Sequence, residues 1–458
     1  MKNYILATLV ALFFSVPAMA QEAPPEGGTP KPFNLPEGYS FTLDNGLKAT
    51  LIPYGVLPKV TAQVIVRTGN VHEESDQVWL ADMMADLMQE GTSTRNATDI
   101  AKEAAQMGGS VNIGVGLDQT YVTGDVLSEF GADVISLMAD VIRNPSFPAD
   151  ELDRLKRDRV RQLNIQQSQP STKAFTKFRE TMYGDHPYGR MYPTEAQLNG
   201  YTVNDIQNFY DTNVGAARAH VYVSGKFDQK SVERAIRDAF GDWNAGPSIS
   251  MVDAAPTSSR QVLLEDIPGA AQSNVYIGLP VIDPSHPDYV ALQVTNSLLG
   301  GSFGSRITSN IREDKGYTYS PYSQVSSRYR DAYWAQVAAV TTNVTGAAIE
   351  EIFKEIDMLQ AEPPPAEELE GIQNYMAGTF VLQNSSRGGI INQLAFLELH
   401  ELDKSYLTNY VDNIYAVTPE DVQRIMQEYI VDENMMIVIA GDVSQIQNQV
   451  AQFEAVAN

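Results

Sequence analysis

Two side chains in the second half of the sequence could together stabilise a developing negative charge. Arg312 and Tyr319 stand seven positions apart within residues 311–320. A guanidinium fork and a phenol can both donate hydrogen bonds to a carbonyl oxygen as that oxygen gains charge. A plainer interpretation is that Arg312 pairs with Glu313 while Tyr317 and Tyr319 alternate as strand residues do. The residues alone leave both interpretations open.

A glycine-rich stretch precedes this pair. Gly300, Gly301 and Gly304 lie within residues 298–306. Glycines so closely spaced favour a sharp turn that allows close approach of the backbone. A phosphate-binding loop is a poor alternative, because no Gly-Lys-Ser or Gly-Lys-Thr follows.

Side chains that could bind a metal are scarce. The chain has no cysteine and five histidines, at positions 72, 186, 220, 286 and 400. No two of them are close enough in sequence to form a local ligand pair. Asp82 and Asp86 share one face of a predicted helix, either as a plain surface pair or as ligands of a hard cation. Because oxygen-only sites usually need more than two ligands, we predict no metal site in this chain.

The first twenty residues have the pattern of a cleavable export signal. Lys2 precedes an apolar run at 4–16, and Ala18-Met19-Ala20 places the cut after Ala20. The apolar run is about 13 residues long, too short to span a bilayer, and no later stretch is as long and uncharged. The mature chain is therefore expected to be periplasmic or secreted, without a membrane anchor.

Composition narrows the class of partner. Acidic residues outnumber basic ones 57 to 32, so the field around the protein repels nucleic acid. Without cysteine, disulfides and lipidation next to the cleavage point are excluded. Residues 21–36 are rich in Pro, Gly and Glu and are predicted to be a flexible leader.

An internal repeat organises the rest of the chain. Thr202 and an acid three residues later predict a capped helix start, and Thr418 repeats the pattern 216 positions on. In both copies a strand then ends at a glycine 23 positions after the threonine, at Gly225 and Gly441. Chance recurrence of a common helix–strand unit is the alternative. We predict an N-terminal domain at 37–245, a linker at 246–260 and a C-terminal domain at 261–458.

Helical and strand periodicities interleave within the first half. Apolar residues at 130–142 recur at helical spacing, Asp150–Gln167 is predicted to form a long charged helix, and residues 111–117 alternate as a half-buried strand. The basic run on the long helix is expected to be a solvated face. The pattern predicts a mixed layer structure of the α/β or α+β type.

Residues 79–92 resemble the active-site helix of insulinase-like (pitrilysin) zinc peptidases. There, an inverted motif H-x-x-E-H precedes a Gly-Thr; the histidines hold zinc and the glutamate accepts a proton from zinc-bound water. Alignment on Gly91-Thr92 places Asp82 and Asp86 at the histidines and Ala85 at the glutamate. Where the family's remote glutamate ligand would fall, residues 159–164 contain no acid.

Two further segments are similar to the same family. Residues 298–320 resemble its second-domain signature, which implies that Arg312 and Tyr319 hold the substrate backbone and help stabilise the oxyanion. Gly300, Gly301 and Gly304 of the preceding turn are expected to bind substrate with them. Residues 183–189 resemble the loop after the long helix, where His186 is interpreted as structural.

The resemblance implies an α+β fold of two homologous domains, each a mostly antiparallel sheet covered by helices, arranged as a clamshell. It also implies a chain without catalytic residues of its own, inactive alone, that pairs with a homologous zinc-bearing subunit and binds an extended peptide at a sheet edge. No cofactor is expected in this chain, since the partner would carry the zinc. A stand-alone peptide-binding or assembly protein is the main alternative, and a peptidase with a rebuilt metal site is a third.

Overall fold

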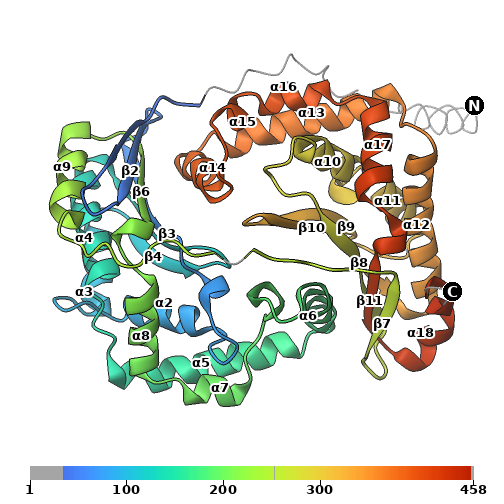
Figure 1. Ribbon diagram of the computed structural model, residues 1–458, viewed down its shortest axis with the longest axis horizontal. Coiled ribbons are helices and arrows are strands. Elements are labelled where there is room, and N and C mark those ends of the chain that lie inside the picture. Colours follow the sequence, from blue (N-terminus) through green and yellow to red (C-terminus); the bar gives the residue numbers. More distant parts are fainter. Residues whose placement is uncertain (1–34, 252, 455–458) are drawn as a thin grey trace, which may run out of the picture. The chain divides into compact units, whose positions relative to one another are not determined.

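The computed structural model describes residues 35–251 and 253–454, and its first half forms a six-stranded sheet. The strand order is β1-β2-β6-β3-β5-β4. Neighbouring strands are antiparallel, except for the parallel pair β2 and β6. The strands are β1 (Tyr39–Thr42), β2 (Lys48–Pro53), β3 (Lys59–Val66), β4 (Ser110–Val115), β5 (Thr120–Leu127) and β6 (Ala219–Gly225) (Figure 1).

The second half forms a five-stranded sheet with the same pattern of pairing. Its order is β7-β11-β8-β10-β9, and the one parallel pair is β7 with β11. The strands are β7 (Gln261–Asp266), β8 (Gln272–Val281), β9 (Tyr322–Arg328), β10 (Asp331–Thr341) and β11 (Met436–Gly441). Two related, mostly antiparallel sheets confirm the predicted α+β class.

The helices follow the same repeat. Moving α5 and α6 forward by 216 positions brings them to α13 and α14 within one residue at each end. In the first half the helices are α2 (Leu80–Gln89), α3 (Ala97–Gln106), α4 (Gly131–Arg143), α5 (Ala149–Gln167), α6 (Pro170–Tyr183), α7 (Glu195–Gly200), α8 (Val203–Asn213) and α9 (Gln229–Phe240). In the second half they are α10 (Tyr289–Asn296), α11 (Arg306–Thr308), α12 (Thr345–Ala361), α13 (Ala366–Gln383), α14 (Arg387–Leu399), α15 (Ser405–Thr408), α16 (Tyr410–Ala416), α17 (Pro419–Tyr429) and α18 (Val443–Val450).

The predicted capping boxes begin α8 and α17. The Asp205 amide donates to the Thr202 hydroxyl at 3.2 Å, and the Thr202 amide donates to the Asp205 carboxylate at 2.8 Å. Thr418 and Asp421 make the same two bonds at 3.1 and 3.0 Å. Each box satisfies amides that have no partner inside the helix.

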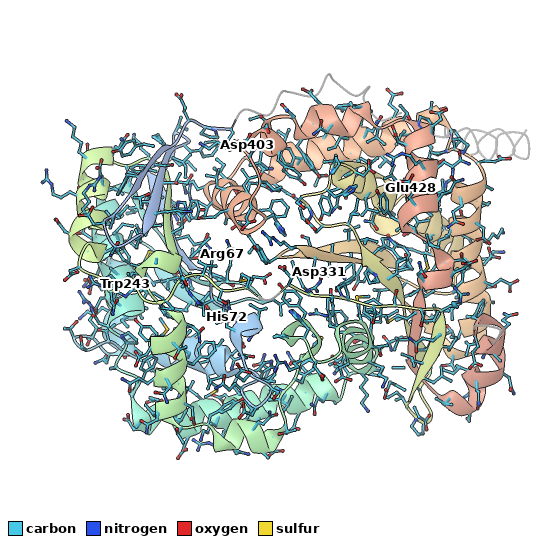
Figure 2. All side chains as sticks on the ribbon, in the orientation of Figure 1. Arg67, His72, Trp243, Asp331, Asp403 and Glu428 are labelled. Carbon is cyan, nitrogen blue, oxygen red and sulfur yellow. The ribbon has the colours of Figure 1, made fainter. Side chains whose placement is uncertain are left out.

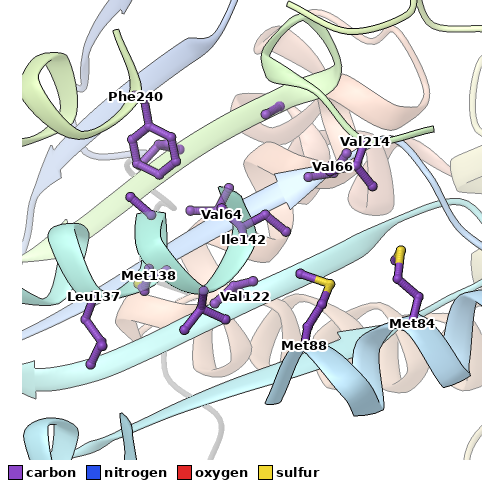
Figure 3. Packing of buried hydrophobic residues seen from close by; sticks show 14 of the residues in the cluster. Val64, Val66, Met84, Met88, Val122, Leu137, Met138, Ile142, Val214 and Phe240 are labelled. Carbon is purple, nitrogen blue, oxygen red and sulfur yellow. The ribbon is translucent and has the colours of Figure 1, made fainter. Parts of the chain in front are cut away.

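The core of the first half lies between its sheet and the helices α2 and α4. Apolar side chains spaced three and four apart on α4 face the alternating valines of β3 and β5, because the helical and strand periods bring each set to one face. Figure 3 shows this packing for Val64, Val66, Val122, Leu137, Met138, Ile142, Met84 and Met88, all buried.

The two halves exchange one helix each. α6 of the first half packs on β8 and β11, where Phe178 is buried with Tyr276 and Val438. α14 of the second half packs on β3 and β6, where Ile391 is buried with Tyr222. These are the equivalent helices of the repeat, so each sheet has one face covered by the other half of the chain.

Three predictions concern the signal, the leader and the linker. The predicted signal at 1–20 lies outside the described residues, as does the predicted leader at 21–36 up to residue 34. In the predicted linker at 246–260, the described residues contain no helix or strand. Across the described ranges, no helix is long and apolar enough to cross a membrane.

Candidate functional site

The first candidate site is the half-buried polar side of α2. The apolar side chains of this helix, Met84 and Met88 among them, enter the core, which leaves Asp82 and Asp86 on the side that faces α5. Their side chains are 21% and 24% exposed. Ala85 is buried and carries no group that could accept a proton.

Arg159 of α5 binds both aspartates. Its Nε and Nη2 donate to the two carboxylate oxygens of Asp86 at 2.6 and 2.9 Å, and its Nη1 donates to Asp82 at 3.2 Å. The Arg159 side chain is only 16% exposed. The expectation that the basic run on this helix is simply solvated is therefore wrong for Arg159, and the two aspartates are not a plain surface pair. The fold brings the two helices together, and three-point pairing follows from the shape of the guanidinium.

A buried glutamate supports the start of α2. Glu73 accepts hydrogen bonds from the amides of Trp79 at 3.0 Å and Ala81 at 2.9 Å. Asn70 links Glu73 to Asp82 through bonds of 3.0 and 2.8 Å. Burial raises the pKa of the Glu73 carboxyl to about 8, with a smaller contribution from the charge of Asp82. Burial also raises the pKa of Asp82, against the lowering effect of Arg159.

Zinc does not fit this arrangement. A zinc site of the H-x-x-E-H type needs neutral imidazoles and a carboxylate base. Here two carboxylates already have a permanent cation between them, and a divalent ion would have to displace Arg159. Over the described part of the chain, no three His, Cys, Asp or Glu side chains are placed to hold a metal.

The second candidate site begins at the glycine-rich stretch. Residues Ser297–Gly301 and Ser309–Asp314 form π-helical turns, a rare conformation that often marks functional positions. A Cβ on Gly300 would lie 2.6 Å from the Ser323 hydroxyl, and one on Gly301 would lie 2.6 Å from the Asn296 amide nitrogen. Two of the three predicted glycines are thus required by close approach, whereas a Cβ on Gly304 would meet open space.

Arg312 and Tyr319 come together in the structure. The Arg312 guanidinium lies 5.1 Å from the centre of the Tyr319 ring and 4.3 Å from that of Phe303. Tyr319 is 80% exposed and Phe303 is 71% exposed. Arg312 also pairs with Glu313 at 3.1 Å, as the plainer interpretation expected, but Tyr319 does not lie in a strand.

Sequence reasoning missed Phe303. Its position between Gly301 and Gly304 was the one available signal, because an aromatic residue in such a turn has no core position to fill. No hydrogen bond or ion pair between described residues joins Arg312 or Tyr319 to Asp82 or Asp86. The two candidate sites are separate clusters on the two halves.

His186 has structural contacts. It accepts a hydrogen bond from the Tyr188 amide at 3.2 Å and packs edge-on against the Tyr188 ring. These contacts hold the turn between Tyr183 and Tyr188, as expected for this residue.

Two family models match consecutive parts of the chain. The model described as insulinase (peptidase family M16) matches residues 55–193, and the model described as peptidase M16 inactive domain matches residues 200–376. The chain belongs to the insulinase family. The resemblance inferred from the α2 and Arg312 segments is thereby confirmed.

Relatives within the insulinase family match along most of their length. An uncharacterized zinc protease of Bacillus subtilis, YmxG, is 23% identical over 404 residues, which cover 87% of this chain and 97% of the relative. An uncharacterized zinc protease of Rickettsia felis is 24% identical over 315 residues, which cover 69% of this chain and 75% of the relative.

Solved structures show the same fold. A peptidase M16 inactive domain from Pseudomonas fluorescens superposes with a TM-score of 0.82 at 22% identity, covering 88% of this chain and 98% of that chain. A protease from Helicobacter pylori also gives a TM-score of 0.82, at 20% identity, with coverages of 89% and 100%.

Proposed function

We propose that this protein is the noncatalytic, peptide-binding subunit of a heterodimeric periplasmic or secreted zinc peptidase. Arg312 and Tyr319 position an extended peptide, and a homologous partner that carries the zinc motif cleaves it. The observation that carries the proposal is the contrast between the two candidate sites. Arg159 already pairs with both aspartates of α2, while the Tyr319 and Phe303 rings beside Arg312 are exposed.

The surroundings of Arg312 suit a substrate backbone. The guanidinium is flanked by two exposed rings, which fix the side chain without using all of its donors. Glu313 pairs with its Nε. The remaining N–H groups and the Tyr319 hydroxyl are donors of the kind that bind a peptide carbonyl.

An open sheet edge provides for an extended ligand. β4 ends the first sheet and pairs with β5 alone. A peptide added as a further strand would gain main-chain hydrogen bonds with little dependence on its sequence. This edge lies next to α2, since the Gln89 side chain donates to the Ile113 carbonyl at 3.3 Å.

The test is a peptidase assay with a quenched fluorogenic peptide. It compares this chain alone, a homologue from the same organism with an intact H-x-x-E-H motif alone, and the two mixed. We expect cleavage to rise in the mixture and the gain to be lost in Arg312→Ala. Tyr319→Phe keeps the ring over Arg312 but removes the hydroxyl, so a loss there assigns the effect to hydrogen bonding.

Matched controls separate this role from general damage. Arg161 has a 74% exposed side chain on α5, and Tyr375 is 53% exposed on α13. Arg161→Ala and Tyr375→Phe should leave the gain unchanged. Equal rates with and without this chain would contradict the subunit role and favour a stand-alone binding or assembly protein.

A further inference from the structure

A narrow cavity lies where α14 covers the first sheet. Its volume is about 30 Å³. Its polar lining includes Lys48, Arg67, Gln119, Arg218, His220 and Glu398. The cavity is markedly basic, although the chain as a whole has a net charge of −25.

Arg67 is buried in this cavity without a carboxylate partner. It is 8% exposed, and its Nε and Nη2 are buried without a hydrogen-bond acceptor. Figure 2 labels Arg67. The Tyr329 ring, 5.0 Å from the guanidinium, covers one face of it. A buried charge whose donors are unused is costly, so these two nitrogens mark a position for an anion.

Arg218 adds a second uncompensated charge. It is 5% exposed and donates to the Ser248 carbonyl at 2.8 and 3.1 Å and to the Asn213 carbonyl at 3.3 Å. These acceptors are neutral. Burial and, next, the charge of Arg218 lower the pKa of His72 to about 4, with a further contribution from Arg67. The positive charges of Arg218 and Arg67 therefore disfavour protonation of a neighbouring histidine.

The acids nearby are committed to other partners. Glu398, which lines the cavity, accepts hydrogen bonds from Lys48 at 2.9 Å, His220 at 2.5 Å and Tyr222 at 2.6 Å. Asp118 accepts a bond from Tyr188, and Glu401 pairs with Arg330 at 2.9 Å. Lys48 and Glu398 balance each other. The charges of Asp118 and Glu401 act on Arg67 from a distance, but no ion pair between described residues joins a carboxylate to Arg67 or Arg218.

The free nitrogens of Arg67 are the pair that binds a carboxylate at two points. In this protein, Nε and Nη2 of Arg159 bind both oxygens of Asp86, and Nε and Nη2 of Arg306 bind both oxygens of Glu368 at 2.7 Å each. In Arg67 the same two groups are buried and have no acceptor. A narrow cavity suits the planar head of a carboxylate and excludes bulky anions.

We infer that this cavity binds the C-terminal carboxylate of a peptide, held by Nε and Nη2 of Arg67 in the field of Arg218. The inference rests on the proposed peptide-binding function and adds a preference for a free C terminus. Inorganic phosphate offers the same oxygen chemistry, so the experiment distinguishes the two.

The experiment measures fluorescence anisotropy of one labelled peptide, prepared with a free C-terminal carboxylate or as the C-terminal amide, binding to the full chain. We expect the acid to bind at least about tenfold more tightly, as a charged hydrogen-bond pair permits. Arg67→Met keeps an apolar stem against Tyr329 and should reduce the ratio of the amide Kd to the acid Kd to about one. Arg161→Met should not change this ratio. Arg67→Lys keeps the charge without the fork and should retain a smaller preference.

Each other outcome has a defined meaning. Equal binding of acid and amide overturns the carboxylate site and leaves peptide binding intact. A preference that survives in Arg67→Met places the carboxylate elsewhere and overturns the inference. No binding of either peptide overturns both the inference and the proposed function. Phosphate could instead raise the melting temperature of the native chain but not that of folded Arg67→Met, while the peptide acid and amide bind equally. That result assigns the cavity to free phosphate and overturns the peptide as its ligand.

Discussion

The guanidinium of Arg159 and the carboxylate of Asp86 meet through two hydrogen bonds, of 2.6 and 2.9 Å, between α5 and α2. The third bond, to Asp82, completes a closed cluster between α5 and α2. A permanent cation thus pairs with both carboxylates. The cluster explains how this helix pair remains packed without a metal.

Removing the cation should destabilise this packing. Arg159→Met leaves two partly buried carboxylates facing each other, and we expect the free energy of unfolding to fall by about 2 kcal/mol, the scale of charged hydrogen bonds. Urea denaturation followed by circular dichroism measures it. In an Asp82→Asn/Asp86→Asn background, Arg159→Met should lower the free energy of unfolding by less, because the two carboxylates no longer repel each other. Equal losses in the two backgrounds would contradict an interaction of Arg159 with these aspartates.

Glu73 should make stability depend on pH in the neutral range. Its pKa is raised from the ordinary 4.5 to about 8 in the folded chain. The folded state therefore binds the proton more tightly, so the contribution is fully present below about pH 4.5 and is lost as the pH rises through about 8. Glu73→Gln should remove this loss. The free energy of unfolding of the variant should therefore rise relative to that of the native protein between pH 6 and 9. The measurement is the free energy of unfolding of both proteins at several pH values. The same pH dependence in both would refute the assignment.

Glu398 should give the opposite dependence at acid pH. Burial raises its pKa, but hydrogen bonds from His220, Tyr222 and Lys48 outweigh burial, and the pKa is held well below the ordinary 4.5. Its stabilisation is present above about pH 4.5 and is lost as the pH falls below that value. Because Glu398 joins α14 to the first sheet, Glu398→Gln should lower the melting temperature at pH 7 and flatten its decline below pH 5. Differential scanning calorimetry across this range is the measurement.

The glycine turn permits a matched comparison. Gly300→Ala would place a Cβ 2.6 Å from the Ser323 hydroxyl and 2.7 Å from the Gln336 side-chain oxygen, and we expect a cost of about 1–3 kcal/mol. Gly304→Ala meets open space and should change stability by less than about 0.5 kcal/mol. Similar costs for the two would show that the close approach at Gly300 is not what the turn requires.

The elements that the sequence predicted well are those with local signals. Residues 150–167 were predicted as a helix and form most of α5, because acids at the start and the helical period act within the segment itself. The capping boxes at Thr202 and Thr418 were equally local. Repetition of these signals 216 positions apart was enough to predict two related halves.

What the sequence did not predict depends on contacts between distant segments. Arg159 and Asp86 are 73 positions apart, and nothing near either residue indicates the pairing. Phe303 beside Arg312 and the unpartnered nitrogens of Arg67 likewise become visible only when the chain is folded. The types of candidate residue could be predicted from sequence, whereas their partners could not.

The most direct test of the central claim is the zinc content of the purified chain after incubation with equimolar zinc and gel filtration, measured by inductively coupled plasma mass spectrometry. The closed cluster of Asp82, Asp86 and Arg159 predicts far less than one zinc per chain, unchanged in Asp82→Asn/Asp86→Asn. One zinc per chain that is lost in this variant would contradict the account, because it would mean that the ion displaces Arg159 and that this half retains a metal centre.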